Sequence, residues 1–138
     1  MSLQTDRSSQ AGPDALGVRT RLFGSSAVLT VRGEIDYGTV PVLDEAVAAL
    51  PPGLRSVVLE MTGVTFMDAA GLHFLRRLDA YGQRRRIPVR ALNLRRQPRR
   101  VLELARTWPG TPRTEKFFGR AAPAGVQVAP EPQWDGTS

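Results

Sequence analysis

Two aspartates in the middle of the chain follow apolar stretches and precede segments with helical periodicity. Asp36 ends the stretch Val31 to Asp36, and Asp68 lies within Thr62 to Leu72. An aspartate at a helix start can accept hydrogen bonds from free backbone N–H groups. The junction of a strand and a helix is also where an α/β sheet presents its ligand-binding edge, and the helix dipole favours negative charge there. These residues alone allow two interpretations, an ordinary capped turn or a binding site.

The sequence contains no recognisable catalytic constellation. It has no cysteine, no Gly-rich phosphate loop, no nucleophile elbow and no Ser/His/Asp set in a plausible order. His73 is the single histidine and has no close carboxylate or histidine neighbours in sequence, which makes a poor metal site. We therefore expect a protein that is not an enzyme and that holds no metal and no cofactor.

Arginine dominates the charge of the chain. The formal net charge is +6, and Lys116 is the single lysine. The basic pairs and triplets are Arg76-Arg77, Arg84 to Arg86, Arg95-Arg96 and Arg99-Arg100. They fit a solvated surface, an acidic partner or a nucleic acid. Aromatic residues do not interleave with them, and no zinc-finger or RNA-binding signature accompanies them, so we expect nucleic-acid binding to be unlikely.

The elements that must position the two aspartates can be predicted from periodicity and turn signals. Branched and apolar runs predict strands at residues 18–23, 27–31, 56–61 and 89–94. Apolar residues at helical spacing predict helices from Thr39 to Leu50, from Asp68 to about Arg86 and from Gln97 to Arg106. The turn Gly24 to Ser26 makes the first two strands a hairpin. Such alternation favours a single α/β domain with a small mixed sheet and helices packed against it.

Composition sets the expected domain boundaries. Residues 1–15 are polar and predict a disordered tail, residues 16–120 the folded domain, and residues 121–138 a flexible tail rich in Pro and Gly, in which Val126 to Val128 could add an edge strand. No stretch has the length of a signal peptide core or of a membrane span. We therefore expect no membrane insertion and a cytoplasmic location.

Both aspartate motifs, taken with the order of the elements, resemble the signature of STAS domains, and in particular that of bacterial anti-sigma-factor antagonists. In that family a hydrophobic strand leads through Ser-Gly-Val-Thr-Phe-Met/Ile-Asp into Ser-Ser-Gly-Leu at a helix start. Thr62 to Leu72 is similar to this pattern, Gly33 to Asp36 is similar to the family's Gly-Glu-Ile/Leu-Asp turn, and Val101 to Leu104 is similar to its third helix. The resemblance covers about Val18 to Ala105.

The resemblance implies a binding protein that sequesters an anti-sigma factor, often one of the histidine-kinase-like ATPase class. It implies a partner surface at Asp36, Asp68, Ala69, Ala70, Gly71 and Leu72. We further expect Gly71 to permit close approach of the partner's backbone. Two other functions stay open: a STAS subunit that docks on the ATPase of a membrane transport complex, and a basic nucleic-acid-binding domain.

The sequence departs from the family at the position that normally carries the phosphorylation switch. The family's switch residue is a serine or threonine, and Ala70 occupies its position, preceded by Ala69. Alanine has no hydroxyl group, so the added charge of about −2 that a phosphate supplies is not accessible there. We therefore expect a partner surface without its usual switch.

Overall fold

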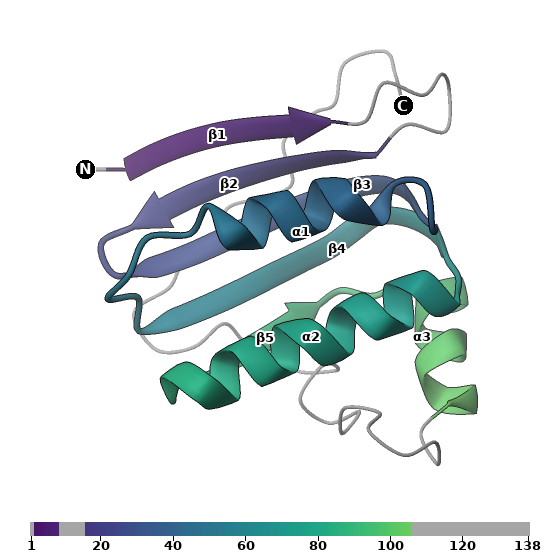
Figure 1. Cartoon of the computed structure of the whole chain (residues 1–138). Helices are drawn as coiled ribbons and strands as arrows, with labels where there is room; N and C mark the ends of the chain where they lie inside the picture. Colours follow the sequence, from purple (N-terminus) through teal and green to yellow (C-terminus); the bar gives the residue numbers. More distant parts are fainter. Residues whose placement is uncertain (1, 9–15, 106–138) are drawn as a thin grey trace.

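The computed structural model describes residues 2–8 and 16–105. Within this part of the chain, strands and helices alternate after an initial group of three strands (Figure 1). The strands are β1 (Ser2–Ser8), β2 (Gly17–Phe23), β3 (Ser26–Ile35), β4 (Ser56–Met67) and β5 (Val89–Leu92). The helices are α1 (Val40–Ala48), α2 (Ala69–Arg85) and α3 (Arg96–Leu104).

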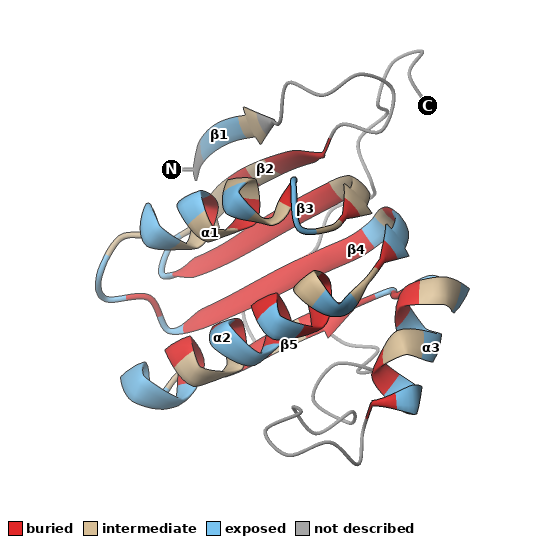
Figure 2. Ribbon diagram, turned by 45° about the vertical axis from the view of Figure 1, so that its right-hand side comes forward, coloured by how far each residue is buried: buried red, intermediate tan, exposed pale blue. Residues whose placement is uncertain are grey.

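The sheet has the strand order β1-β2-β3-β4-β5 and is mixed. β1, β2 and β3 pair antiparallel, whereas β3, β4 and β5 pair parallel. Both parallel crossovers run in the same direction across the sheet, and such connections are almost always right-handed, so α1 and α2 must cover the same face. Figure 2 shows the two helices side by side on that face. The predicted fold class, a single α/β domain with a small mixed sheet, is confirmed.

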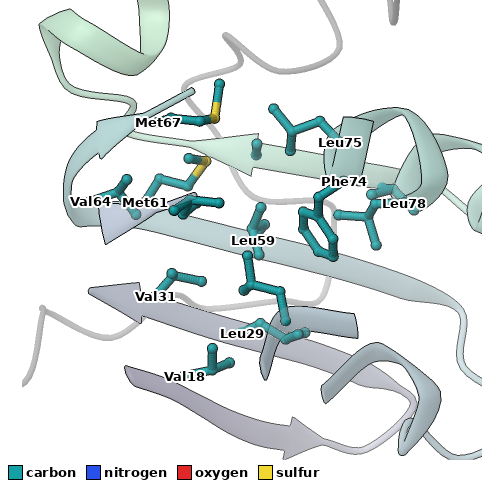
Figure 3. Close-up of a cluster of buried hydrophobic side chains, with 14 of the residues drawn as sticks. Val18, Leu29, Val31, Leu59, Met61, Val64, Met67, Phe74, Leu75 and Leu78 are labelled. Atoms are coloured by element: carbon teal, nitrogen blue, oxygen red, sulfur yellow. The ribbon is translucent and has the colours of Figure 1, made fainter. Parts of the chain in front are cut away.

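The core lies between this helix layer and the central strands β3 and β4. Leu29 and Leu59 from the sheet meet Phe74, Leu75 and Leu78 from α2, and all five are at most 1% exposed (Figure 3). Leu72, Leu75, Leu78 and Tyr81, the apolar residues whose helical spacing predicted α2, are all buried, as expected. Among the described residues, no helix combines the length and the apolar character that crossing a membrane requires.

The first strand was not predicted from the sequence. Residues 1–15 were expected to form a disordered tail, but Ser2–Ser8 forms β1 and pairs along its length with β2. Most of its residues are polar, and cross-strand side-chain contacts accompany its backbone pairing with β2. Asp6 accepts a hydrogen bond from Arg19 Nε at 3.0 Å, and Gln4 accepts one from Arg21 Nε at 3.2 Å. The predicted tail 121–138, with its possible strand at Val126 to Val128, lies outside the described residues.

The strand that leads to Asp68 is longer than predicted. We expected it to end near Met61 and to continue as a loop, but β4 runs to Met67. β3 is also extended, to Ile35, and the two strands stay paired through two register shifts. Gly63 lies at one shift, where its backbone passes so close to β3 that an added Cβ would be 2.8 Å from Arg32 Cβ. The two extended strands hold Asp36 and Asp68 at their ends.

Candidate functional site

The ends of β3 and β4 bring the two aspartates to one edge of the sheet. Ile35 pairs with Met67, and the backbone N–H of Asp68 donates to the carbonyl of Ile35 at 3.2 Å. Asp36 and Asp68 directly follow this pair, and α1 and α2 begin just beyond them (Figure 1). The expectation that Asp36 lies beside the Asp68 segment is therefore confirmed. Two helix N-termini, each with a positive dipole end, converge at this edge.

Asp36 orders the turn that opens α1. Its Oδ1 accepts hydrogen bonds from the backbone N–H groups of Gly38 at 2.9 Å and Thr39 at 3.0 Å. The hydroxyl of Thr39 donates to the carbonyl of Glu34 at 2.8 Å and accepts from the backbone N–H of Asp36 at 2.9 Å. These bonds satisfy backbone groups of the turn that leads from β3 into α1. Asp36 thus has a structural role in this turn, which does not depend on any partner.

Asp68 is the N-cap of α2, as predicted. Its extended backbone precedes the helix, and its Oδ1 accepts the backbone N–H of Ala70 at 2.8 Å. Its carbonyl accepts the N–H groups of Gly71 at 3.0 Å and Leu72 at 3.2 Å. The cap therefore fixes the backbone of Ala69 and Ala70 at the helix start and leaves Ala69 exposed and Ala70 half-buried.

Gly71 faces the core rather than a partner. A Cβ added there would lie 2.1 Å from Met67 Cγ, 2.9 Å from Met67 Sδ and 3.1 Å from Ile35 Cγ2. Met67 belongs to the buried cluster in Figure 3. The expectation that this glycine offers a point of close approach to a partner's backbone is therefore wrong: the close neighbours are the chain's own side chains. Leu72 is also buried, at 2% exposure. Gly71 and Leu72 therefore lie beneath the edge. Its accessible part comprises the exposed Ala69 and the half-buried Asp36, Asp68 and Ala70.

Two exposed aromatic side chains flank this edge and were not singled out from the sequence. Tyr37 is 86% exposed and directly follows Asp36, while Phe66 is 39% exposed and precedes Asp68 by two residues. Exposed tyrosines are typical of protein–protein interfaces because the ring offers a large contact area with a polar end. Their sequence signal was weak, since an aromatic residue next to a turn is as often part of the core.

Gln97 ties α3 to the strand end before Asp68. Its side-chain Oε1 accepts the backbone N–H of Met67 at 2.7 Å, and its Nε2 donates to the carbonyl of Met67 at 3.0 Å. One amide group thus satisfies both backbone groups of Met67 and replaces the pairing that a further strand would supply. The first turn of α3 therefore lies against the start of α2.

The described residues of this edge do not form a metal-binding cluster. Across residues 2–8 and 16–105, no three acidic, histidine or cysteine side chains are arranged to hold a metal ion. His73 is exposed on α2, with its Nδ1 3.3 Å from Arg76 Nη1. The described edge therefore offers backbone dipoles, two carboxylates, small side chains and aromatic rings, which suit contact with another protein.

The comparisons with known proteins decide the family. The family model described as "Mlab, STAS domain" matches residues 18–107, which include both aspartate motifs and exclude β1. The chain belongs to the STAS domain family. This STAS domain is similar in structure to an anti-sigma factor antagonist from Mycobacterium paratuberculosis, with a TM-score of 0.54 and 24% identity over 72% of this chain and 87% of that one.

A second structure with a similar fold is an antisigma-factor antagonist STAS domain from Rhodobacter sphaeroides, with a TM-score of 0.47 and 21% identity over 56% of this chain and 86% of that one. No curated protein matches the chain. At 24% identity, the similarity to the structure from Mycobacterium paratuberculosis shows the fold alone.

Proposed function

We propose that this STAS domain is a regulatory binding protein that sequesters an anti-sigma factor, and that it does so without the usual phosphorylation switch. The partner that we propose is an anti-sigma factor of the histidine-kinase-like ATPase class, and the location is the cytoplasm. The protein acts by binding and is not an enzyme. The proposed partner surface comprises Asp36, Tyr37, Asp68, Ala69 and Ala70, which we call the aspartate edge, with Gly71 and Leu72 beneath it.

One observation carries the proposal: the most exposed large apolar side chain among the described residues stands at the aspartate edge. Tyr37 is 86% exposed beside Asp36. Next to it the exposed Ala69 and the half-buried Ala70 open α2 without any bulky side chain. An exposed aromatic side chain and small residues at one edge of a sheet suit a protein partner. The resemblance of this segment to the anti-sigma-factor antagonist signature indicates which kind of protein.

The absence of a switch follows from Ala70. By the resemblance, position 70 corresponds to the family's switch serine or threonine. Here that position, at the start of α2 behind the Asp68 cap, carries only a methyl group. An anti-sigma factor bound here could not release itself by phosphorylating that position. We therefore propose a persistent complex, controlled by the amounts of the two proteins rather than by phosphate.

Direct titration tests the proposed function. Each anti-sigma factor encoded in the source genome is purified and titrated with the full chain by calorimetry, together with Tyr37→Ala and the control Gln83→Ala. Gln83 is exposed at the opposite end of α2. We expect one anti-sigma factor to bind, Tyr37→Ala to lose about tenfold or more in affinity, as interface anchors do, and Gln83→Ala to bind unchanged.

Two results would contradict the proposal. The first is that no anti-sigma factor binds and the ATPase of a membrane transport complex does. The chain would then be a STAS subunit of such a complex. If an anti-sigma factor binds equally well to wild type and to Tyr37→Ala, the partner surface does not centre on the aspartate edge.

A further inference from the structure

α3 carries an arrangement of charge that works against its own stability. Its N-cap is Arg95, which makes no side-chain capping bond, and its first turn contains no acidic residue. Arg96, Arg99 and Arg100 follow, so the N-cap and the first five positions of the nine-residue helix carry four guanidinium groups. The helix dipole is positive at that end, and cations there are unfavourable. Helix stability therefore gives no reason for the cations at Arg95 and Arg96.

These charges are directed outward. Arg95, Arg96, Arg99 and Arg100 are all exposed. Arg95, Arg96 and Arg100 form no ion pair with any other described residue, whereas the ion pairs found in this part of the chain lie elsewhere, for example Arg77–Asp44 at 2.9 Å. Glu103 is the single acidic residue of α3. Arg95, Arg96 and Arg100 consequently give this face an excess of positive charge.

The same face is hollowed and partly apolar. A shallow hollow of about 640 Å³ is lined by Arg96, Arg99, Arg100, Glu103 and Leu104. Leu104 is 72% exposed, which is unusual for a large aliphatic side chain at the end of an amphipathic helix. Guanidinium groups bind carboxylates in a bidentate geometry, and a leucine at the rim of the hollow offers contact to an apolar side chain.

Hydrogen bonds also connect α3 to the aspartate edge. Gln97 lies between Arg96 and Arg99 in the sequence. Its side-chain amide hydrogen-bonds to the backbone N–H and carbonyl of Met67, the residue before Asp68. The N-terminal turn of α3 therefore lies against the start of α2, at the same end of the sheet (Figure 2). A partner bound to the aspartate edge would therefore lie beside the exposed arginines of α3.

From this geometry we infer that the exposed face of α3, formed by Arg95, Arg96, Arg99, Arg100 and Leu104, is a docking surface for an acidic segment of a protein partner that also carries an apolar side chain. The inference rests on the proposed function, because it extends the same partner's contact from the aspartate edge onto α3. A protein segment fits better than a nucleic acid: Leu104 and the Glu103 carboxylate would lie against phosphates, and no aromatic side chain on α3 offers a base-stacking platform.

Matched neutralising variants test the inference. In Arg96→Gln/Arg100→Gln two charges of the α3 face are removed, and in the control Arg84→Gln/Arg86→Gln two exposed arginines are removed at the far end of α2. Both full-length variants are titrated with the anti-sigma factor that binds wild type, at low and at physiological salt. We expect the α3 variant to lose about tenfold or more in affinity and much of its salt dependence, and the control to lose neither.

A second probe separates this inference from the proposed function. A synthetic peptide rich in glutamate and leucine, and a single-stranded DNA of the same net charge, are titrated against wild type, the α3 variant and Ala70→Asp. We expect the peptide to bind wild type and Ala70→Asp alike and the α3 variant more weakly.

Wild-type affinity of the α3 variant for the anti-sigma factor would overturn the inference and leave the proposed function intact. Tighter binding of the DNA than of the peptide, lost in the α3 variant, would overturn it in favour of a nucleic acid. Equal losses of affinity in the α3 variant and in its control would also overturn the inference, because they would show a general electrostatic attraction and no specific surface on α3. Peptide binding without any anti-sigma-factor binding would support the acidic-segment surface while the proposed function fails.

Discussion

Replacing Gly71 by alanine should destabilise the domain, although alanine is the better helix former. The added Cβ would lie 2.1 Å from Met67 Cγ and 3.1 Å from Ile35 Cγ2, whereas carbon atoms pack at about 3.5–4.0 Å. Overpacking of a core costs about 1–3 kcal/mol, and a contact this short belongs at the upper end of that range. The gain in helix propensity is about 1 kcal/mol. The expected net loss is therefore about 2 kcal/mol.

Thermal and chemical unfolding would measure this loss. A shift of about 4 °C per kcal/mol is typical of a domain of this size, so Tm should fall by about 8 °C. The control is Gly38→Ala, where the added Cβ would lie at an ordinary 3.5 Å from Asp36 Oδ1 and stability should change by less than about 0.5 kcal/mol.

A double-mutant cycle with Met67→Ala identifies the contact responsible. Met67→Ala alone should cost about 2–5 kcal/mol, because it leaves a cavity in the core. In the double variant the new methyl group at position 71 occupies part of that space, so the combined loss should be smaller than the sum by about 1–2 kcal/mol. A Gly71→Ala variant as stable as wild type, or a cycle without coupling, would refute the inward orientation of Gly71.

Three further predictions concern the aspartate edge. Asp68→Ala should lower the free energy of unfolding by about 1 kcal/mol and Asp68→Asn by less than half of that, because the amide oxygen can still accept the Ala70 N–H; urea unfolding distinguishes them, and equal losses would exclude the cap as the cause. Asp36→Ala should also cost about 1 kcal/mol, because the hydrogen bonds that its Oδ1 accepts from Gly38 and Thr39 in the turn before α1 are lost; unchanged stability would contradict this role in the turn. With a kinase-type anti-sigma factor and ATP, mass spectrometry should find no phosphate at position 70 in wild type and one phosphate in Ala70→Ser; phosphate on the exposed Thr65 instead would show that the switch position was wrongly assigned.

Much of the fold could be predicted from the sequence because its signals are local. The hairpin before residue 31, the helix behind the Asp68 cap and the stripe Leu72, Leu75 and Leu78 each follow from periodicity or turn chemistry. The assignment of Asp68 as an N-cap was confirmed on the same basis. What these features share is that neighbours in sequence determine them.

The features that were missed depend on partners distant in sequence. β1 is polar and exists through its pairing with β2, which a composition-based prediction cannot detect. The extension of β4 to Met67 follows from its pairing with β3 across two register shifts, which the exposed residues Thr65 and Phe66 conceal. Gln97 hydrogen-bonds to the backbone of Met67, which lies 30 residues before it in the sequence.

The orientation of Gly71 is a different case, because a local signal for it existed. Gly71, Leu75, Leu78 and Gly82 recur at spacings of four, three and four residues, which place all of them on one face of α2. All four are buried. The glycine therefore belongs to the core-facing stripe. Helical periodicity was a better guide to its orientation than the general tendency of glycine to allow close approach of a partner.

The central claim is that a protein partner covers the start of α2, and an added charge at Ala70 tests it most directly. In Ala70→Asp a carboxylate would be enclosed without a partner charge in the complex, which typically costs about 2–5 kcal/mol, or roughly a 30- to 5,000-fold loss of affinity. In the free domain the same carboxylate lies at the positive end of a helix dipole, so Tm should stay close to that of wild type. The matched control is Ala49→Asp, at the exposed C-terminal end of α1.

Titration calorimetry of the three proteins against the anti-sigma factor, with a thermal scan of each, gives the answer. The account predicts that Ala70→Asp folds and loses its partner, while Ala49→Asp folds and binds like wild type. A folded Ala70→Asp variant with wild-type affinity would contradict the account and place the interface elsewhere on the domain.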